Sequence, residues 1–404
     1  MNINRSLKKK IPIIIVLALF IAVFGFLTKI NAHEQDLLLN SESVILIDQT
    51  SGDILYQKNS SKQMYPASIT KIISGILAIE DGDLNEDVTI SQEATEVIGT
   101  SVYLLEEEEV PLRDLVKGML INSGNDASYA IAEHLAGGEE AFAEKMNELV
   151  QEDIGVDNTN FVNPHGLFDE EQYTTAEDMA RITQYAMENE TFKDIVGMNE
   201  YEWESEGWET TIHNHHQLVR QHDEITGVKN GYVQKSGYTL VTTASHEDEQ
   251  IDLVAVTLDS PSANHAYSDT EALINYGFEN YETNEIQRGE LIEDHDGQEY
   301  KVEENLYFTT EVDEDWTTQV DENGELKIKN EDDLVILEKP LRTVAEIEGE
   351  GDPKESQIAM GASELPNEDD SYTFLLISLI ILTILALFTT FTVRKRRKRD
   401  RFFR

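Results

Sequence analysis

The sequence predicts an α+β fold, with one antiparallel sheet packed against a cluster of helices, for most of the chain's 404 residues. Short apolar segments with strand character come first along the chain, and helical spacing of apolar residues dominates the middle. Alternation with a period of two then returns from Ile225 onward. Because the chain holds no cysteine, a disulfide scaffold, a thiol nucleophile and a cysteine-ligated metal site are excluded.

The first predicted elements are a strand hairpin and a helix. Ser43–Asp48 and Asp53–Tyr56 are rich in branched and aromatic residues, and the segment between them is polar and contains glycine. Pro66 and Ser68 then open a pattern with helical spacing that runs to Ile79.

Helical spacing recurs in the middle of the chain, and strands follow it. We predict helices at 112–120, 127–135, 142–150 and 176–187, and strands at 227–233, 238–244 and 251–258. A short polar break at 122–125 separates the first two of these helices, and polar turns at 234–237 and 245–250 separate the strands.

The sequence pattern from Arg288 to the last residue predicts a small all-β domain and a membrane anchor. Alternation without helical spacing continues from Arg288 to Ile347, and the acidic segment 348–371, which has few large apolar residues, is typical of a tether. Residues 373–393 carry no charge over 21 residues, enough for a transmembrane helix, and six basic residues follow at 394–399. Since basic flanks stay in the cytoplasm, we expect this tail inside the cell and the body of the protein outside.

The N-terminus carries a second apolar run, from Ile11 to Leu27, preceded by three lysines, which is typical of a signal peptide or a short signal anchor. We therefore expect six segments: 1–32, a signal peptide or signal anchor; 33–282, the α+β domain; 283–347, the small β domain; 348–371, the acidic tether; 372–393, the transmembrane helix; and 394–404, the basic cytoplasmic tail.

The charge is unevenly distributed along the chain. The net charge is −48, but the two ends, 1–32 and 394–404, hold 13 basic residues and one acidic residue. The middle, 33–371, therefore has 18 basic and 78 acidic residues, a net charge of −60. A body this acidic repels phosphate backbones, so we expect no nucleic acid partner.

Ser68 and Lys71 have the spacing that lets a serine nucleophile meet a base. Residues three apart on a helix share a face, so the hydroxyl and the amine can touch. A serine is a weak nucleophile until a base takes its proton, and a lysine can do so when burial or a nearby cation lowers its pKa. The N-terminus of the helix would also favour an oxyanion at this serine.

Two further motifs are candidates for substrate contacts. In the polar break, an extended chain would put Ser123 and Asn125 on one side, the first to relay a proton and the second to hold an amide. On a predicted strand, the sequence Lys229-Asn230-Gly231 offers a lysine that can bind a carboxylate and a glycine against which a substrate backbone can lie. Each motif is common by itself, but their order within one α+β domain is informative.

From Ser43 to about Tyr276 the chain resembles the serine D-Ala-D-Ala carboxypeptidases, the low-molecular-mass penicillin-binding proteins. The resemblance extends beyond the three motifs to longer segments: Asp48–Tyr56, Pro66–Lys71, Leu120–Ala127, Phe161–Leu167, Tyr173–Ala180, Gly227–Lys229 and Gly237–Val241. The resemblance implies a β-lactamase/transpeptidase-like fold for 33–282. The order of the segments expected after it in this chain, a small β domain and then a membrane anchor, also resembles that family.

The resemblance implies a role for each residue of the first two motifs. Ser68 would be the nucleophile that the penultimate D-Ala carbonyl acylates, and Lys71 would be its general base. Ser123 would pass a proton to the leaving amine, and Asn125 would position the substrate amide. β-Lactams would acylate Ser68 and leave slowly.

The third motif would bind the end of the substrate. Lys229 would hold the terminal carboxylate and lower the pKa of Lys71, and the backbone N–H groups of Ser68 and Tyr232 would form the oxyanion hole. The family usually has Thr or Ser where this chain has Asn230, followed by Gly231. An amide can still donate to a carboxylate, so the difference bears on efficiency and preferred substrate more than on the reaction class.

A literal Lys-Ser-Gly occurs six residues later, at Lys235-Ser236-Gly237. We favour Lys229, because Gly227-Val228 before it fits an active-site strand, whereas Lys235 falls in the predicted turn.

Other patterns point to structural roles. His213, His215 and His216 lie close in sequence, but no His-Glu-x-x-His pattern exists in the chain, so we expect no metal and no other cofactor. We interpret Pro164-His165-Gly166 as a turn of the family rather than a catalytic histidine, and Glu106–Glu109 as a solvated loop rim.

The sequence therefore predicts a serine D-alanyl-D-alanine carboxypeptidase that acts on peptidoglycan pentapeptides, is inhibited by β-lactams and is held at the bacterial cell membrane by one C-terminal anchor, with its catalytic domain extracellular. Two alternatives stay open: a D,D-endopeptidase that cleaves peptide cross-links, and a weakly active penicillin-binding module that tethers the wall. A class A β-lactamase is disfavoured, because the chain lacks a Glu-x-x-x-Asn sequence between the second and third motifs.

Overall fold

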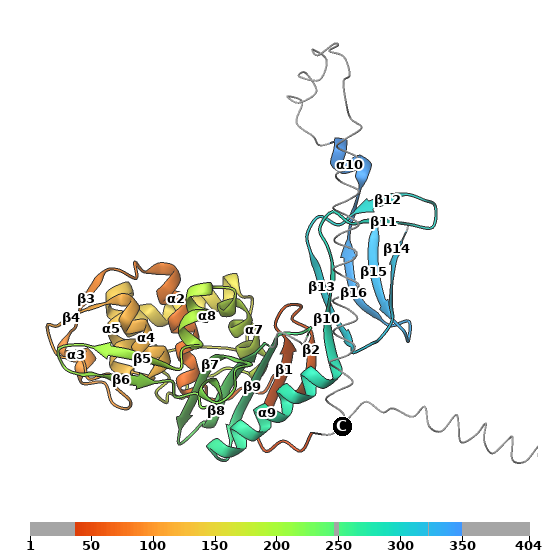
Figure 1. Cartoon of the computed structure of the whole chain (residues 1–404). Helices are drawn as coiled ribbons and strands as arrows, with labels where there is room; N and C mark the ends of the chain where they lie inside the picture. Colours follow the sequence, from red (N-terminus) through yellow and green to blue (C-terminus); the bar gives the residue numbers. More distant parts are fainter. Residues whose placement is uncertain (1–36, 246–249, 322, 350–404) are drawn as a thin grey trace, which may run out of the picture. The chain divides into compact units, whose positions relative to one another are not determined.

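The computed structural model describes residues 37–245, 250–321 and 323–349 (Figure 1). The predicted leader, transmembrane helix and basic tail, and all but the start of the tether, lie outside these residues. Among the helices in the described ranges, none combines the length and the apolar character needed to cross a bilayer.

A five-stranded antiparallel sheet forms the centre of the α+β domain, in the order β2-β1-β9-β8-β7 (Figure 1). Its strands are β1 (Ser43–Asp48), β2 (Ile54–Lys58), β7 (Ile225–Val233), β8 (Gly237–Ala244) and β9 (Leu253–Ser260). The first and last parts of the domain meet in this sheet, since Ser43 pairs with Leu258 and Asp48 pairs with Leu253. All five strands were predicted, and β7 lies at the edge of the sheet.

Helices cover both faces of the sheet, which explains why β1 is buried along its whole length. Ile45 and Ile47 face the larger helical cluster, whereas Val44 and Leu46 face the opposite core, which includes Leu273. This alternation follows from the period of two in a strand.

The larger cluster contains most of the predicted helices. Its elements are a 3₁₀ turn (Ala67–Thr70), α2 (Lys71–Asp81), β3 (Asp87–Thr89), α3 (Gln92–Thr95), β4 (Glu109–Pro111), α4 (Leu112–Ile121), α5 (Asn125–Ala136), α6 (Glu139–Glu148), a π-helical turn (Leu149–Asp153), α7 (Ala176–Met187), α8 (Glu190–Val196), β5 (Glu200–Glu204), β6 (Glu209–His213) and a 3₁₀ turn (Leu218–Arg220). The four helices predicted in the middle of the chain are confirmed as α4, α5, α6 and α7, with ends shifted by up to three residues.

The opposite face is covered by α9 (Ala263–Asn280), which the sequence analysis did not predict. Thr270 and Gly277 interrupt the apolar stripe of this helix, so the helical spacing of its apolar residues is hard to recognise in the sequence. In the structure Gly277 supplies the close approach to the sheet, because a Cβ there would lie 2.6 Å from Leu253 Cδ1. The helix begins at an N-cap, where the Ser262 side chain accepts from the His265 backbone.

Short strands follow α9 and enclose a small core of their own. They are β10 (Tyr281–Ile286), β11 (Leu291–Glu293), β12 (Glu299–Lys301), β13 (Leu306–Glu311), β14 (Trp316–Val320), β15 (Glu325–Asn330), β16 (Val335–Pro340) and β17 (Arg342–Thr343). Phe308 and Ile328 are fully buried in this core. The expectation that β structure continues to Ile347 is wrong, because α10 (Val344–Gly349) is a helix; it belongs to a separate unit of the chain.

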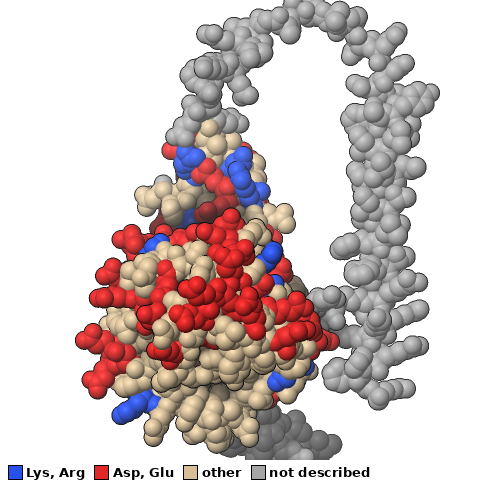
Figure 2. All heavy atoms as spheres, turned by 90° about the vertical axis from the view of Figure 1, so that its left-hand side faces the viewer, with Lys and Arg blue, Asp and Glu red and all other residues tan. Residues whose placement is uncertain are grey.

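Acidic side chains cover much of one face of the molecule (Figure 2). Figure 2, which looks onto the end of the molecule that carries α3 and the β5–β6 hairpin, shows Asp and Glu side chains over a large part of this face and few Lys or Arg side chains. The site described next depends instead on two lysines that are buried.

Candidate active site

Ser68 lies in the 3₁₀ turn that leads directly into α2, and Lys71 is the first residue of that helix. Lys71 Nζ lies 3.3 Å from Ser68 Oγ, so the predicted contact across one helical turn is present. Ser68 is half-buried and its neighbour Ala67 has φ 51°, a left-handed conformation that is costly for a residue with a Cβ. Such strain next to a half-exposed hydroxyl is typical of a functional turn.

Lys71 is fully buried, and its amine has three polar partners. Besides Ser68 Oγ, its Nζ donates to Asn125 Oδ1 at 2.7 Å and to the His165 backbone oxygen at 2.6 Å. Burial, assisted by the positive charge of Lys229, holds the pKa of Lys71 well below its ordinary value of 10.5, and the Asp126 carboxylate acts in the opposite direction. A lysine of lowered pKa has a free amine available, which is what a general base for Ser68 requires.

The second motif connects α4 to α5, but not in the extended form expected from the sequence. Ser123 has φ 64° and is 7% exposed, and Asn125 is the first residue of α5. The expectation that the two side chains share one side of an extended stretch is therefore wrong. The tight left-handed turn instead directs Asn125 to Lys71.

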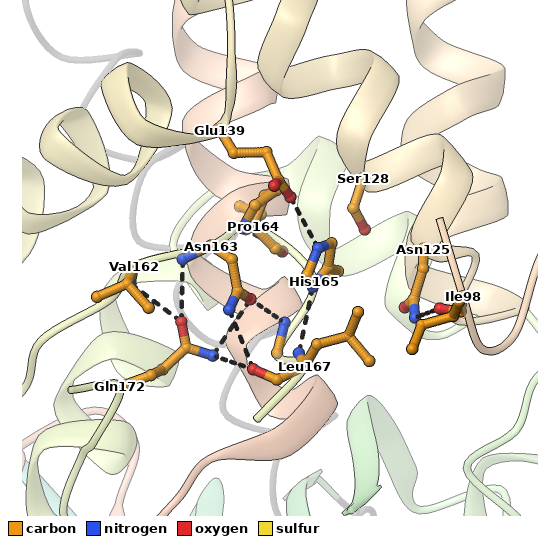
Figure 3. Close-up of polar contacts among 12 residues, drawn as sticks. Ile98, Asn125, Ser128, Glu139, Val162, Asn163, Pro164, His165, Leu167 and Gln172 are labelled. Atoms are coloured by element: carbon orange, nitrogen blue, oxygen red, sulfur yellow. Dashed lines mark hydrogen bonds and ion pairs between the residues drawn. The ribbon is translucent and has the colours of Figure 1, made fainter. Parts of the chain in front are cut away.

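Both ends of the Asn125 amide have partners within the protein. Its oxygen accepts from Lys71, and its nitrogen donates to the Ile98 backbone oxygen at 2.7 Å (Figure 3). The neighbouring Gly99 lies against the same nitrogen, because a Cβ there would be 2.6 Å away from it. In this state Asn125 Oδ1 holds Lys71. Because Nδ2 carries two hydrogens, it can keep its bond to Ile98 and still donate the second hydrogen to a substrate carbonyl.

The third motif lies on β7, where Lys229 is 1% exposed. Its Nζ donates to the backbone oxygen of Asn230 at 2.9 Å and lies 3.4 Å from Asn230 Oδ1. Burial lowers the pKa of Lys229 to about 7. By contrast, Lys235 is exposed in the turn between β7 and β8, so the buried lysine whose charge acts on Lys71 is Lys229.

Gly231 brings β7 into contact with the nucleophile turn. A Cβ at this position would lie 2.7 Å from the Ser68 backbone nitrogen and 2.6 Å from Thr239 Oγ1. From β8, Thr239 Oγ1 also donates to the Pro66 backbone oxygen at 2.9 Å. The edge of the sheet and the turn that carries Ser68 are thus held together, as a substrate bound between them would need.

Tyr232 follows Gly231 and exposes its ring to solvent. The ring is 54% exposed and its centroid lies 4.5 Å from that of Tyr238. Both tyrosines line a cavity of about 230 Å³ together with His215, Asn230 and Tyr267. A second cavity of about 350 Å³ lies at the turn end of the hairpin, between Lys235 and Tyr65.

A turn from Asn163 to Leu167 forms the other wall behind Lys71, although its sequence pattern predicts only a structural role. Besides the His165 oxygen that accepts from Lys71, Gly166 lies against the nucleophile turn, since a Cβ there would be 1.9 Å from the Ala67 backbone oxygen. Gly166 has φ 84°, which favours glycine. The glycine after His165 was the available sequence signal for this close approach.

Two neighbouring histidines, His215 and His216, lie near Lys229 and have lowered pKa values. Burial, with the charge of Lys229, lowers the pKa of His215 to about 4 and that of His216 to about 3. His216 Nε2 lies 2.8 Å from Thr242 Oγ1, and His213 pairs with Glu200 at 3.2 Å. Across the described ranges, no group of three or more His, Asp or Glu residues is arranged to hold a metal ion.

Comparison with known proteins gives a consistent picture. Residues 29–262 match the family model described as D-alanyl-D-alanine carboxypeptidase. The D-alanyl-D-alanine carboxypeptidase DacF of Bacillus subtilis is 31% identical over 277 residues, which is 67% of this chain and 70% of DacF. DacA of Haemophilus influenzae is 32% identical over 265 residues, which is 61% of this chain and 63% of DacA.

Solved structures show the same arrangement of helices and sheet. Penicillin binding protein 5 from Haemophilus influenzae superimposes with a TM-score of 0.69 at 25% identity, over 77% of this chain and 98% of that one. A mutant of the Streptomyces K15 DD-transpeptidase gives a TM-score of 0.56 at 26% identity, over 59% of this chain and 98% of its own. The fold is thus similar to that of penicillin-binding transpeptidases.

Proposed function

This chain belongs to the D-alanyl-D-alanine carboxypeptidase family, and from that premise we propose that it removes the terminal D-Ala of peptidoglycan stem peptides through an acyl-enzyme on Ser68. One observation supports Ser68 as the nucleophile and Lys71 as its base. Ser68 Oγ lies 3.3 Å from the amine of a fully buried lysine, Lys71, on a turn that also contacts the strand of a second buried lysine, Lys229.

Acylation begins with proton transfer from Ser68 Oγ to the free amine of Lys71, whose pKa is lowered by burial and by Lys229. The oxygen then attacks the carbonyl carbon of the penultimate D-Ala. When the tetrahedral intermediate collapses, the C–N bond breaks and the leaving amine of the terminal D-Ala takes a proton through Ser123. The products of this half-reaction are free D-Ala and an ester on Ser68.

Charge stabilisation comes from the backbone and from Lys229. The N–H groups of Ser68 and Tyr232 lie on the two segments that meet at Gly231, and we assign them to the oxyanion hole. Each such donor is worth about 3–4 kcal/mol in other acyl-transfer enzymes. Protonated Lys229 binds the terminal carboxylate, which fixes the position of the scissile bond.

Water completes the cycle by attack on the ester, with Lys71 again accepting a proton. β-Lactams follow the same first step, and their acyl-enzyme is hydrolysed slowly, which is the basis of penicillin binding in this family. A penicillin carries a carboxylate next to its reactive amide, so it also satisfies Lys229.

A membrane location is a separate proposal. It is supported by the uncharged run 373–393 and the basic residues after it. The acidic body would then face the cell wall, where its substrate is found. Recovery of the parent protein in the membrane fraction would support the proposal, and its recovery in the soluble fraction would contradict it. Release into the soluble fraction after deletion of 373–404 would assign the anchor to 373–393, whereas membrane recovery after the deletion would assign it to the N-terminal run.

The function is tested by the product. Detergent-solubilised full-length protein, its Ser68→Ala variant and a Lys235→Ala variant are incubated with a pentapeptide ending in D-Ala-D-Ala and, separately, with a cross-linked peptide dimer. We expect D-Ala release from the pentapeptide by the parent and Lys235→Ala proteins and none by Ser68→Ala. Cleavage of the dimer without D-Ala release would instead show an endopeptidase.

A further inference from the structure

The Glu139 carboxylate lies directly behind the turn that holds Lys71. Its Oε1 is 2.7 Å from His165 Nε2, and the His165 side chain is 6% exposed (Figure 3). Glu139 is the first residue of α6, where the positive end of the helix favours a carboxylate. Its own side chain is 31% exposed, so one edge of the pair is open to solvent.

The hydrogen bonds of His165 define which ring nitrogen carries the proton. The Leu167 backbone N–H donates to Nδ1 at 3.2 Å, so Nδ1 is an acceptor and the proton of the neutral ring is on Nε2. The ring nitrogen that carries the proton, Nε2, is therefore the one that lies 2.7 Å from Glu139 Oε1 (Figure 3). Burial lowers the pKa of His165, which keeps the ring neutral at pH 7 and this arrangement intact.

The rest of the turn is rigidly connected, so the ring and the backbone oxygen of His165 move together. Asn163 Oδ1 accepts from the Gly166 N–H at 2.8 Å, and Asn163 Nδ2 donates to the Leu167 oxygen at 3.0 Å (Figure 3). Gln172 Oε1 accepts from the Asn163 N–H at 3.1 Å. The Glu139–His165 pair ties the turn itself to the first residue of α6. Farther along α6, Asn147 makes two hydrogen bonds to the backbone of Phe161, just before the turn.

We propose that Glu139 is a positioning residue for the general base: through the His165 ring it fixes the backbone oxygen that accepts from Lys71 Nζ, and so holds the amine within reach of Ser68. The proposal rests on the function proposed above. Its chain of contacts is Glu139 Oε1 to His165 Nε2 at 2.7 Å, then the His165 oxygen to Lys71 Nζ at 2.6 Å, then Lys71 Nζ to Ser68 Oγ at 3.3 Å.

The Glu139–His165 pair should affect the pH dependence of acylation, because it acts on the groups that set the pKa of Lys71. The charged groups that act on Lys71 are Lys229, which lowers its pKa, and Asp126, which raises it. Those that act on His165 are Glu139 and Lys71. Because the short bond to the His165 oxygen favours the ammonium form of Lys71, a looser turn lowers the pKa of Lys71 further. The acid limb of acylation then moves to lower pH even though the rate falls.

The test uses full-length protein in detergent, with penicillin acylation followed in a stopped-flow fluorimeter between pH 5 and pH 9 and D-Ala release measured in parallel. For Glu139→Ala we expect an acylation rate and kcat lower by about 10- to 100-fold, which is about 1.4 to 2.7 kcal/mol, with KM within about twofold and the acid limb shifted downward. Glu139→Gln keeps an acceptor for Nε2–H and should recover most of the rate. Glu140→Ala removes an exposed carboxylate from the same helical turn and should match the parent protein.

Two outcomes would contradict the role of Glu139, and a third would contradict the proposed function. If Glu139→Ala keeps the parental rate and pH profile, or if Glu140→Ala loses as much, Glu139 does not position Lys71. If the Glu139→Ala rate falls only in proportion to the folded fraction measured by thermal unfolding, the pair is structural. Failure of the parent protein itself to react with penicillin or release D-Ala would overturn the proposed function instead.

Discussion

Replacing Lys229 with methionine tests the electrostatic core of the site. Lys229→Met keeps most of the side-chain volume at a position that is 1% exposed, but removes the buried positive charge. Loss of one partner from a buried charge pair costs about 2–5 kcal/mol, so kcat/KM for a peptide with a free terminal carboxylate should fall by about 30-fold to several thousand-fold. A peptide whose terminal carboxylate is amidated gains nothing from Lys229, so its rate should change far less.

The same substitution changes the pH profile in two directions. The pKa of Lys229 is about 7 in the free protein, so parental kcat/KM should fall as the pH rises through that value and the carboxylate-binding ammonium is lost. Lys229→Met should lack this alkaline limb. Because the charge of Lys229 also lowers the pKa of Lys71, its removal should raise that pKa and move the acid limb to higher pH.

The matched control is Lys235→Met, in the exposed turn of the same hairpin. It should stay within about twofold of the parent in kcat/KM, since an exposed charge contributes little. Thermal unfolding should show Lys229→Met folded, because an apolar residue in place of a buried charge is often neutral or stabilising. The reasoning is refuted if Lys229→Met spares activity while Lys235→Met abolishes it, or if amidated and free peptides lose rate equally.

Three further predictions concern packing, hydrogen bonds and the unusual third motif. Gly231→Ala places a Cβ 2.7 Å from the Ser68 nitrogen, so acylation should slow about 100-fold at a stability cost of only about 1–3 kcal/mol; an unchanged acylation rate would show that the contact is not needed. Asp269 accepts from the Ser41 N–H at 2.7 Å and has a pKa below its ordinary 3.8, so its ionised form stabilises the fold above about pH 4 and this contribution is lost as the pH falls through the lowered pKa. Asp269→Asn should therefore lose about 1–3 kcal/mol in urea unfolding at pH 7 and progressively less as the pH is lowered below about 4. A loss that does not change with pH would contradict the assignment. Asn230→Thr removes the amide oxygen 3.4 Å from the Lys229 amine and supplies a smaller hydroxyl donor, so kcat/KM should rise by about threefold, roughly 0.6 kcal/mol; a decrease would mean that the amide itself recognises the substrate.

Features with a local cause could be predicted from the sequence. The apolar run of β1 is continuous because helices cover both faces of the sheet, and it reads as a strand by length and residue type. Ser68 and Lys71 meet because their spacing is a property of the helix itself. The choice of Lys229 over Lys235 also followed from local pattern, since one lies on a strand and the other in a turn.

Features that depend on contacts between distant parts of the chain could not be predicted from the sequence. Glu139 and His165 are 26 residues apart and meet only because α6 and the turn pack on the same side of Lys71. Ser123 adopts a left-handed conformation that its residue type does not announce, so an extended segment was the wrong expectation. Helix α9 was missed because its buried side relies on Gly277 and Thr270, whose packing depends on the sheet beneath them.

The most direct test of the account is to identify the residue that becomes acylated. Full-length protein is reacted with penicillin, digested and analysed by tandem mass spectrometry, with the Ser68→Ala variant treated in the same way. We predict that the penicilloyl group is found on Ser68 alone and that the variant carries none. An adduct on another residue, or labelling that persists in Ser68→Ala, would contradict the central claim that Ser68, activated by Lys71, is the nucleophile.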